Sequence, residues 1–114
     1  MTRSRRSLGV NQLEAILNSI EVKNFCNYTI RVVTQNGQKW IVFSDICKVF
    51  GYVNPAHQLK YVVPEEIRKI DIGLKNTLAN CVSQKAIANL VMISSRSIAS
   101  DFREWADEEV FGNE

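Results

Sequence analysis

The chain has 114 residues, of which 46% are hydrophobic, and this suits one compact domain with a modest core. It contains no apolar run near the roughly 20 residues of a membrane span and no N-terminal signal-peptide stretch, so we expect a cytosolic protein without a membrane partner. The net charge of +2 divides into −5 for residues 101–114, with one Arg and six acidic residues, and +7 for residues 1–100, a basic body typical of proteins that meet phosphate groups.

The first 24 residues are predicted to form a basic arm followed by an amphipathic helix. Arg3, Arg5 and Arg6 lie in a Ser-containing segment without periodicity, which we expect to be disordered alone; it either remains a solvated tail or orders against a phosphate backbone. From Gln12 to Val22, aliphatic residues recur at i, i+3, i+4 and i+7, which predicts an apolar helical stripe. The stripe consists of Leu13, Ile16, Leu17 and Ile20. It either packs on its own domain or pairs with a second copy in a homodimer.

A β-hairpin is predicted around Asn36 and Gly37, because these residue types tolerate the positive φ angles of a two-residue turn. The predicted pairs are Gln35 with Gln38, Thr34 with Lys39, Val33 with Trp40, Val32 with Ile41, Arg31 with Val42 and Ile30 with Phe43. Alternate residues share a face, so one face is apolar and the other mixed. The apolar face, which we expect in the core, consists of Ile30, Val32, Ile41 and Phe43.

Two short helices are predicted directly after the hairpin. Ser44 is placed as the N-cap of the first, with Asp45 in its first turn, where a negative charge suits the helix dipole. Gly51 is placed to end this helix in a left-handed conformation. Asn54 and Pro55 then have the residue types of a cap and a first helical position, so a second helix begins there.

The rest of the chain predicts two more strands and two more helices. One extended segment runs from Ile67 to Ile72, and another strand covers about residues 78–82. Ser83 is a good N-cap for a helix, and the last helix begins near Ser97. The apolar stripe of the last helix consists of Ile98, Phe102 and Trp105. The predicted fold class is therefore α+β, a small antiparallel sheet with a β-hairpin packed against several short helices.

Two blocks of residues carry a resemblance to a known family. The first block is Val32, Val33, Gly37, Trp40, Asp45, Gly51, Tyr52, Asn54 and Pro55; the second is Ser95, Arg96, Ala99, Phe102, Trp105, Glu108, Glu109 and Val110. In order and spacing they resemble the Bro-N domain, the N-terminal domain of BRO proteins of insect DNA viruses and of prophage antirepressors. The chain departs from this pattern at Phe111 and Gly112, where the family usually has Leu-Pro. We divide the chain into residues 1–24 and a Bro-N-like domain over residues 25–114.

The resemblance implies a regulatory domain of viral or prophage origin that binds double-stranded DNA in transcription control. Its candidate contacts are the basic or polar residues Arg31, Lys39, Asn54, His57, Lys60 and Arg96. A second group, suited to nonspecific phosphate contacts, is Arg3, Arg5, Arg6, Arg68 and Lys69. Arg31 has a structural alternative, a cation–π pair with Trp40. The functional alternative is a protein-interaction module that binds and inactivates a repressor through the acidic last helix or the first apolar stripe.

No catalytic site, metal site or cofactor is predicted. The single histidine, His57, has no Cys or carboxylate at a spacing typical of a nucleophile and base pair, so we expect no enzyme. Cys26, Cys47 and Cys81 are odd in number and form no CxxC arrangement, which favours small buried thiols over disulfides or zinc ligands. We expect the protein in the cytoplasm of its host cell, or in the nucleus if the host is eukaryotic.

Overall fold

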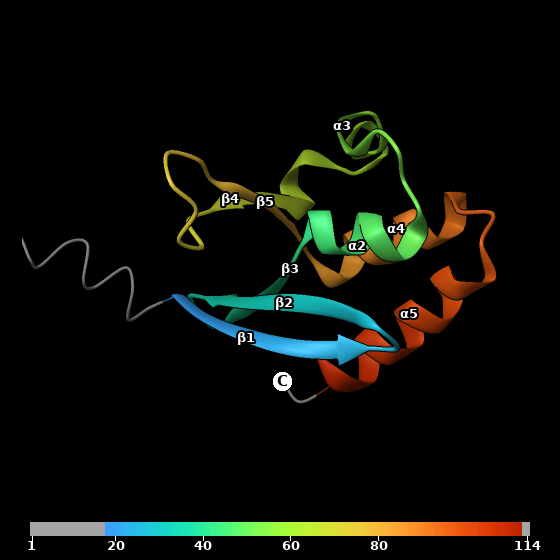
Figure 1. Cartoon of the computed structure of the whole chain (residues 1–114), viewed down its shortest axis with the longest axis horizontal. Coiled ribbons are helices and arrows are strands. Elements are labelled where there is room, and N and C mark those ends of the chain that lie inside the picture. Colours follow the sequence, from blue (N-terminus) through green and yellow to red (C-terminus); the bar gives the residue numbers. More distant parts are fainter. Residues whose placement is uncertain (1–17, 113–114) are drawn as a thin grey trace, which may run out of the picture.

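The computed structural model describes residues 18–112, which form one five-stranded antiparallel sheet and the helices packed against it (Figure 1). The strands are β1 (Asn18–Phe25), β2 (Tyr28–Gln35), β3 (Gln38–Val42), β4 (Ile67–Ile70) and β5 (Ala79–Val82). The α-helices are α2 (Phe43–Phe50), α3 (Pro55–Gln58), α4 (Gln84–Ile93) and α5 (Ser97–Glu109), and the 3-10 turns are η1 (Leu59–Tyr61) and η2 (Pro64–Glu66). The strand order is β1-β2-β3-β5-β4, and the predicted α+β class is confirmed.

The predicted β2–β3 hairpin is present, but it is shorter than expected. Asn36 and Gly37 have φ angles of 53° and 81°, as a two-residue turn requires. The four pairs nearest the turn form as predicted, and the ladder ends at Val32 opposite Ile41. The two outermost pairs were predicted wrongly, because the chain enters α2 after β3. The α2 N-cap is likewise Val42, without a side-chain cap, and not Ser44.

The prediction of a helix from Gln12 to Val22 is wrong over its last five residues, which belong to β1. This strand pairs with β2 along its whole length, from Asn18 opposite Gln35 to Phe25 opposite Tyr28. The reason lies in residues 20–23, which alternate β-branched and charged side chains with the period of a strand. Ile20 therefore belongs to a sheet. The other members of the predicted stripe, Leu13, Ile16 and Leu17, lie outside the described residues.

Buried side chains lie on both faces of the sheet rather than on one, apart from the edge strand β1. The predicted core face is confirmed, since Ile30, Val32, Ile41 and Phe43 are all buried in a cluster shared with α2, α4 and α5. The opposite face, which the sequence presents as mixed, holds a second and smaller cluster. Its buried members are Val33, Trp40, Val42, Ile70, Ala79 and Cys81. Trp40 is 1% exposed, and the guanidinium over its ring is that of Arg68, 4.9 Å from the centroid, instead of Arg31.

Local capping signals place the remaining helices. Gly51 ends α2 with φ 74°, as predicted. The side chains of Asn54 and Ser83 accept hydrogen bonds from the backbone amides of His57 and Ala86, each at 3.3 Å, so each caps its helix as expected. Aromatic contacts join α5 to the sheet and to α2, because the Phe102 ring lies edge-on to the rings of Phe25 and Phe50.

Candidate functional site

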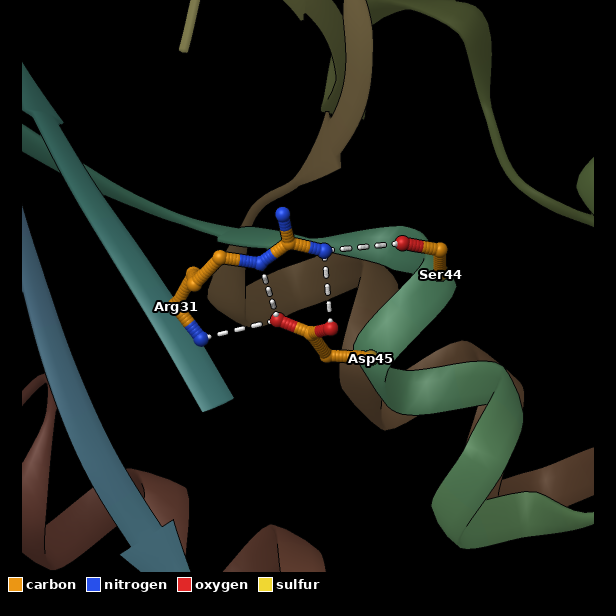
Figure 2. Close-up of polar contacts among 3 residues, drawn as sticks. All are labelled: Arg31, Ser44 and Asp45. Carbon is orange, nitrogen blue, oxygen red and sulfur yellow. Dashed lines mark hydrogen bonds and ion pairs between the residues drawn. The ribbon is translucent and has the colours of Figure 1, made fainter. Parts of the chain in front are cut away.

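Arg31, the first candidate contact, is tied to a buried carboxylate (Figure 2). Its backbone amide and Nε both donate to Asp45 Oδ2, and its Nη2 donates to Asp45 Oδ1, each at 2.9 Å. Nη2 also donates to Ser44 Oγ at 3.2 Å. Asp45 is 3% exposed, and its hydrogen bond raises the pKa of Arg31, an effect that partial burial only partly offsets. Arg31 therefore joins β2 to α2, and of its guanidinium nitrogens only Nη1 has no partner among the described residues.

Lys39 also has a structural partner. Its Nζ donates to the backbone carbonyl of Val110 at 3.0 Å, where α5 ends. A cation at this position satisfies an end carbonyl and suits the negative end of the helix dipole. Lys39 thus links the last helix to the β2–β3 hairpin.

Arg96 lies where the two blocks of family-like residues meet. Its Nη1 is 3.5 Å from the carbonyl oxygen of Phe50, at the C-terminal end of α2. A Cβ atom at Gly51 would lie 1.8 Å from the same nitrogen, so the glycine makes room for the arginine. Arg96 is nevertheless exposed as a residue, and its positive charge remains accessible to solvent.

His57 and Lys60 are exposed on α3 and η1. The His57 ring packs edge-on against Tyr61, with centroids 5.8 Å apart. No hydrogen bond or ion pair within residues 18–112 engages either side chain. Lys48, exposed on α2, was not among the predicted contacts. Lys48 lies outside the apolar stripe of Ile46, Val49 and Phe50, and this position in the helical pattern indicates a side chain that faces solvent.

The second group of candidate contacts is scattered. Arg68 covers Trp40 and donates from Nη1 to Gln35 Oε1 at 3.0 Å, while Lys69 is exposed on the edge strand β4. Arg3, Arg5 and Arg6 lie outside the described residues. The structure therefore does not gather the predicted contacts into one cluster.

A cleft of about 370 Å³ lies between α3 and the β4–β5 connection. Its lining is mostly apolar, with Pro55, Leu59 and Leu74 among the side chains, and Arg31 and Ser44 contribute polar groups. Lys39 instead lines a separate cavity of about 210 Å³ together with Lys85 and Phe111. The cleft thus brings Arg31 close to α3, whereas Lys39 belongs to another part of the surface.

The thiols divide into two kinds. Burial raises the pKa of Cys47 and of Cys81 to about 12, so both remain protonated thiols at neutral pH. Cys26 is exposed in the β1–β2 turn, and the expectation of three buried thiols is wrong for this residue. Within the described residues, no group of three or more His, Cys, Asp or Glu side chains could hold a metal ion. No helix in this part of the chain has the length and apolar character needed to cross a bilayer.

Comparison with known proteins gives one result that covers most of the chain. A family model described as the N-terminal domain of the BRO family, Bro-N, matches residues 29–112. Neither curated proteins nor solved structures give a match. The matched range includes both blocks of residues on which the resemblance rests, and the Gly51–Arg96 contact between those blocks is part of the matched domain. The chain therefore belongs to the Bro-N family.

Proposed function

We propose that this domain binds double-stranded DNA as a regulator of viral or prophage origin that acts in transcription control. Membership of the Bro-N family supports the regulatory class. The observation that carries DNA binding is a basic ridge, which we define as Lys48, His57, Lys60 and Arg96. These residues are exposed on α2, on α3 with η1, and on the turn before α5.

The elements of the basic ridge adjoin one another. Helix α2 contacts both α3 and α5, and Arg96 reaches the C-terminal end of α2. Figure 1 shows α3 next to α2 on the side of the molecule away from β1. Residues 46–64 contain no acidic side chain, so no carboxylate of this segment neutralises the ridge. A segment that exposes Lys48, His57 and Lys60 and carries no carboxylate favours contact with the phosphates of a duplex.

The test is fluorescence-anisotropy binding of the whole chain to labelled duplex DNA across a salt series. We expect the logarithm of the association constant to fall linearly with the logarithm of the salt concentration. Lys60→Ala and Arg96→Ala should each weaken binding and lower that slope by about one, the loss of one phosphate contact.

The matched control is Lys85→Ala, which removes the same charge from an exposed position beside the separate cavity of Lys39. It should leave the slope unchanged. Circular dichroism would establish that every variant is folded. Absence of binding at low salt by a folded sample, or an equal loss in the Lys85 variant, would contradict the proposal.

A second candidate function has a specific observation in its favour. Helix α5 exposes the carboxylates of Asp101, Glu104, Glu108 and Glu109, an acidic face suited to a basic protein partner. On this alternative the domain binds and inactivates a repressor or another regulatory protein. If a folded sample does not bind DNA, this alternative is tested by pull-down of protein partners. Such partners should bind the unmodified chain and be lost when the α5 carboxylates are neutralised.

A further inference from the structure

Strand β1 forms one edge of the sheet, and no strand of the described residues pairs with its outer side (Figure 1). In an antiparallel ladder, alternate residues direct their backbone N–H and C=O groups toward the neighbouring strand and away from it. Val22 lies opposite Arg31, and the Arg31 amide donates to Asp45 on the far side of β2. The backbone N–H and C=O groups of Val22 and Arg31 therefore point away from each other, which directs those of Val22 to the outer side of β1. By alternation, the backbone groups of Ile20 and Asn24 also point to this outer side.

The side chains of β1 are also exposed in a distinctive pattern. Ile20 and Val22 are 45% and 61% exposed on the face that carries Val33. Glu21 and Lys23 share the opposite face, where their charged groups are 3.4 Å apart. An edge whose outward backbone groups have no strand partner within residues 18–112, and whose β-branched side chains are exposed, is a template for another strand, and natural proteins commonly cover such edges.

We propose that a second copy of this chain pairs with β1 in antiparallel orientation, about a two-fold axis at Val22, so that one sheet runs through the dimer. This register places Glu21 opposite Lys23 of the second copy, and Lys23 opposite its Glu21. It places Val22 opposite itself, with Ile20 diagonal to it on the same face. The outward groups of Ile20, Val22 and Asn24 would supply about six backbone hydrogen bonds across the axis.

The charges select this register among the alternatives. An axis at Ile20 would place Glu21 opposite Ser19, and an axis at Asn24 would place Lys23 opposite Phe25. Only the axis at Val22 gives two oppositely charged pairs. The proposal concerns the outer edge of β1 and does not rest on DNA binding. It uses the strand edge in place of the predicted helical stripe, for which packing on its own domain and pairing with a second copy were both open.

Sedimentation equilibrium of the whole chain tests the proposal through a charge swap. The unmodified chain should show a concentration-dependent dimer. Glu21→Lys and Lys23→Glu each set two like-charged pairs across the axis, so each should raise the dimer dissociation constant about tenfold. The double variant Glu21→Lys with Lys23→Glu restores opposite pairs and should restore the dimer. A folded chain that stays monomeric at every concentration, or a dimer indifferent to the single reversals, would overturn the proposal.

A cysteine placed at the axis gives a second readout of the register. Opposed residues of a hydrogen-bonded pair have Cα atoms about 5.5 Å apart, within reach of a disulfide. Val22→Cys should therefore cross-link two copies under mild oxidation, in a Cys26→Ser background that removes the exposed native thiol. Asn24→Cys in the same background faces Ile20 of the second copy and should not cross-link. Cross-linking through position 24 but not through position 22 would refute this register.

Discussion

The carboxylate of Asp45 is the most consequential charge inside this fold. It is almost completely buried, and Arg31 supplies all three of its hydrogen bonds. Replacing Arg31 by Ala would leave a buried anion with a single backbone donor. We expect Arg31→Ala to lower the free energy of unfolding by about 3 kcal/mol, in the range found when a buried ion pair loses one partner. Urea denaturation followed by circular dichroism measures this loss.

The double variant Arg31→Ala with Asp45→Asn is the control, because it leaves no buried charge behind. It should recover part of the stability that the single variant loses. If Arg31→Ala were as stable as the unmodified chain, the ion pair would contribute nothing to the fold.

The roles of Arg31 and Lys39 could not be predicted from the sequence, and the reason is distance along the chain. The partner of Arg31 lies 14 residues away, and that of Lys39 lies 71 residues away. When only the neighbouring residues in the sequence are considered, a basic residue in a matched motif is predicted to contact phosphate. The packing of α2 and α5 gives these two side chains internal partners instead, whereas Lys60 keeps the exposure expected of it.

Gly51 ends helix α2 in a left-handed conformation and lies against the guanidinium of Arg96. We expect Gly51→Ala to cost only slightly more stability than Gly37→Ala, because both residues have positive φ and the added methyl group at position 51 displaces only the end of the flexible Arg96 side chain, which then loses its contact with the Phe50 carbonyl oxygen. Gly37→Ala should cost about 1 kcal/mol from backbone strain alone. Thermal denaturation of the two variants measures the difference.

Adding Arg96→Ala to the Gly51 variant tests the cause of that difference. Without the guanidinium, the cost at position 51 should fall to that at position 37. Should the excess persist without Arg96, the backbone of α2 and not the arginine would be responsible.

Most caps and turns with local chemistry were predicted correctly, although the α2 N-cap was not, and strand β1, which depends on pairing with its neighbour β2, was predicted as part of a helix. Gly51, Asn54 and Ser83 act within four residues of their own positions, so their caps and turns follow from residue type. Strand β1 exists because β2 offers eight residues to pair with. Ile20 fits a helical stripe and a strand equally well in sequence, and tertiary pairing decides between them.

Across the whole molecule, charge is divided between the basic ridge and the acidic last helix. Replacing Glu104 and Glu108 by Gln removes two exposed negative charges from α5. If the domain binds DNA through the ridge, this change should strengthen binding several-fold at low salt, and the gain should vanish as salt screens the long-range field. The anisotropy titration at two salt concentrations measures both effects.

The same variant distinguishes the two proposed functions. A domain that holds a protein partner through α5 should lose that partner when the carboxylates are neutralised, while its DNA affinity stays unchanged. If the variant binds DNA at low salt as tightly as the unmodified chain does, the electrostatic field of the α5 carboxylates does not act on bound DNA.

The insertion of β5 between β3 and β4 also fixes an order of assembly. Strands β1, β2 and β3 are joined by two-residue turns, so they can pair as a three-stranded meander before the rest of the sheet has formed. The seam between β3 and β5 joins Ile41 to Val82, 41 positions further along, and must wait for a much larger loop to close. During synthesis, the meander would leave the ribosome with its inner edge open, and that edge is protected only after β5 arrives.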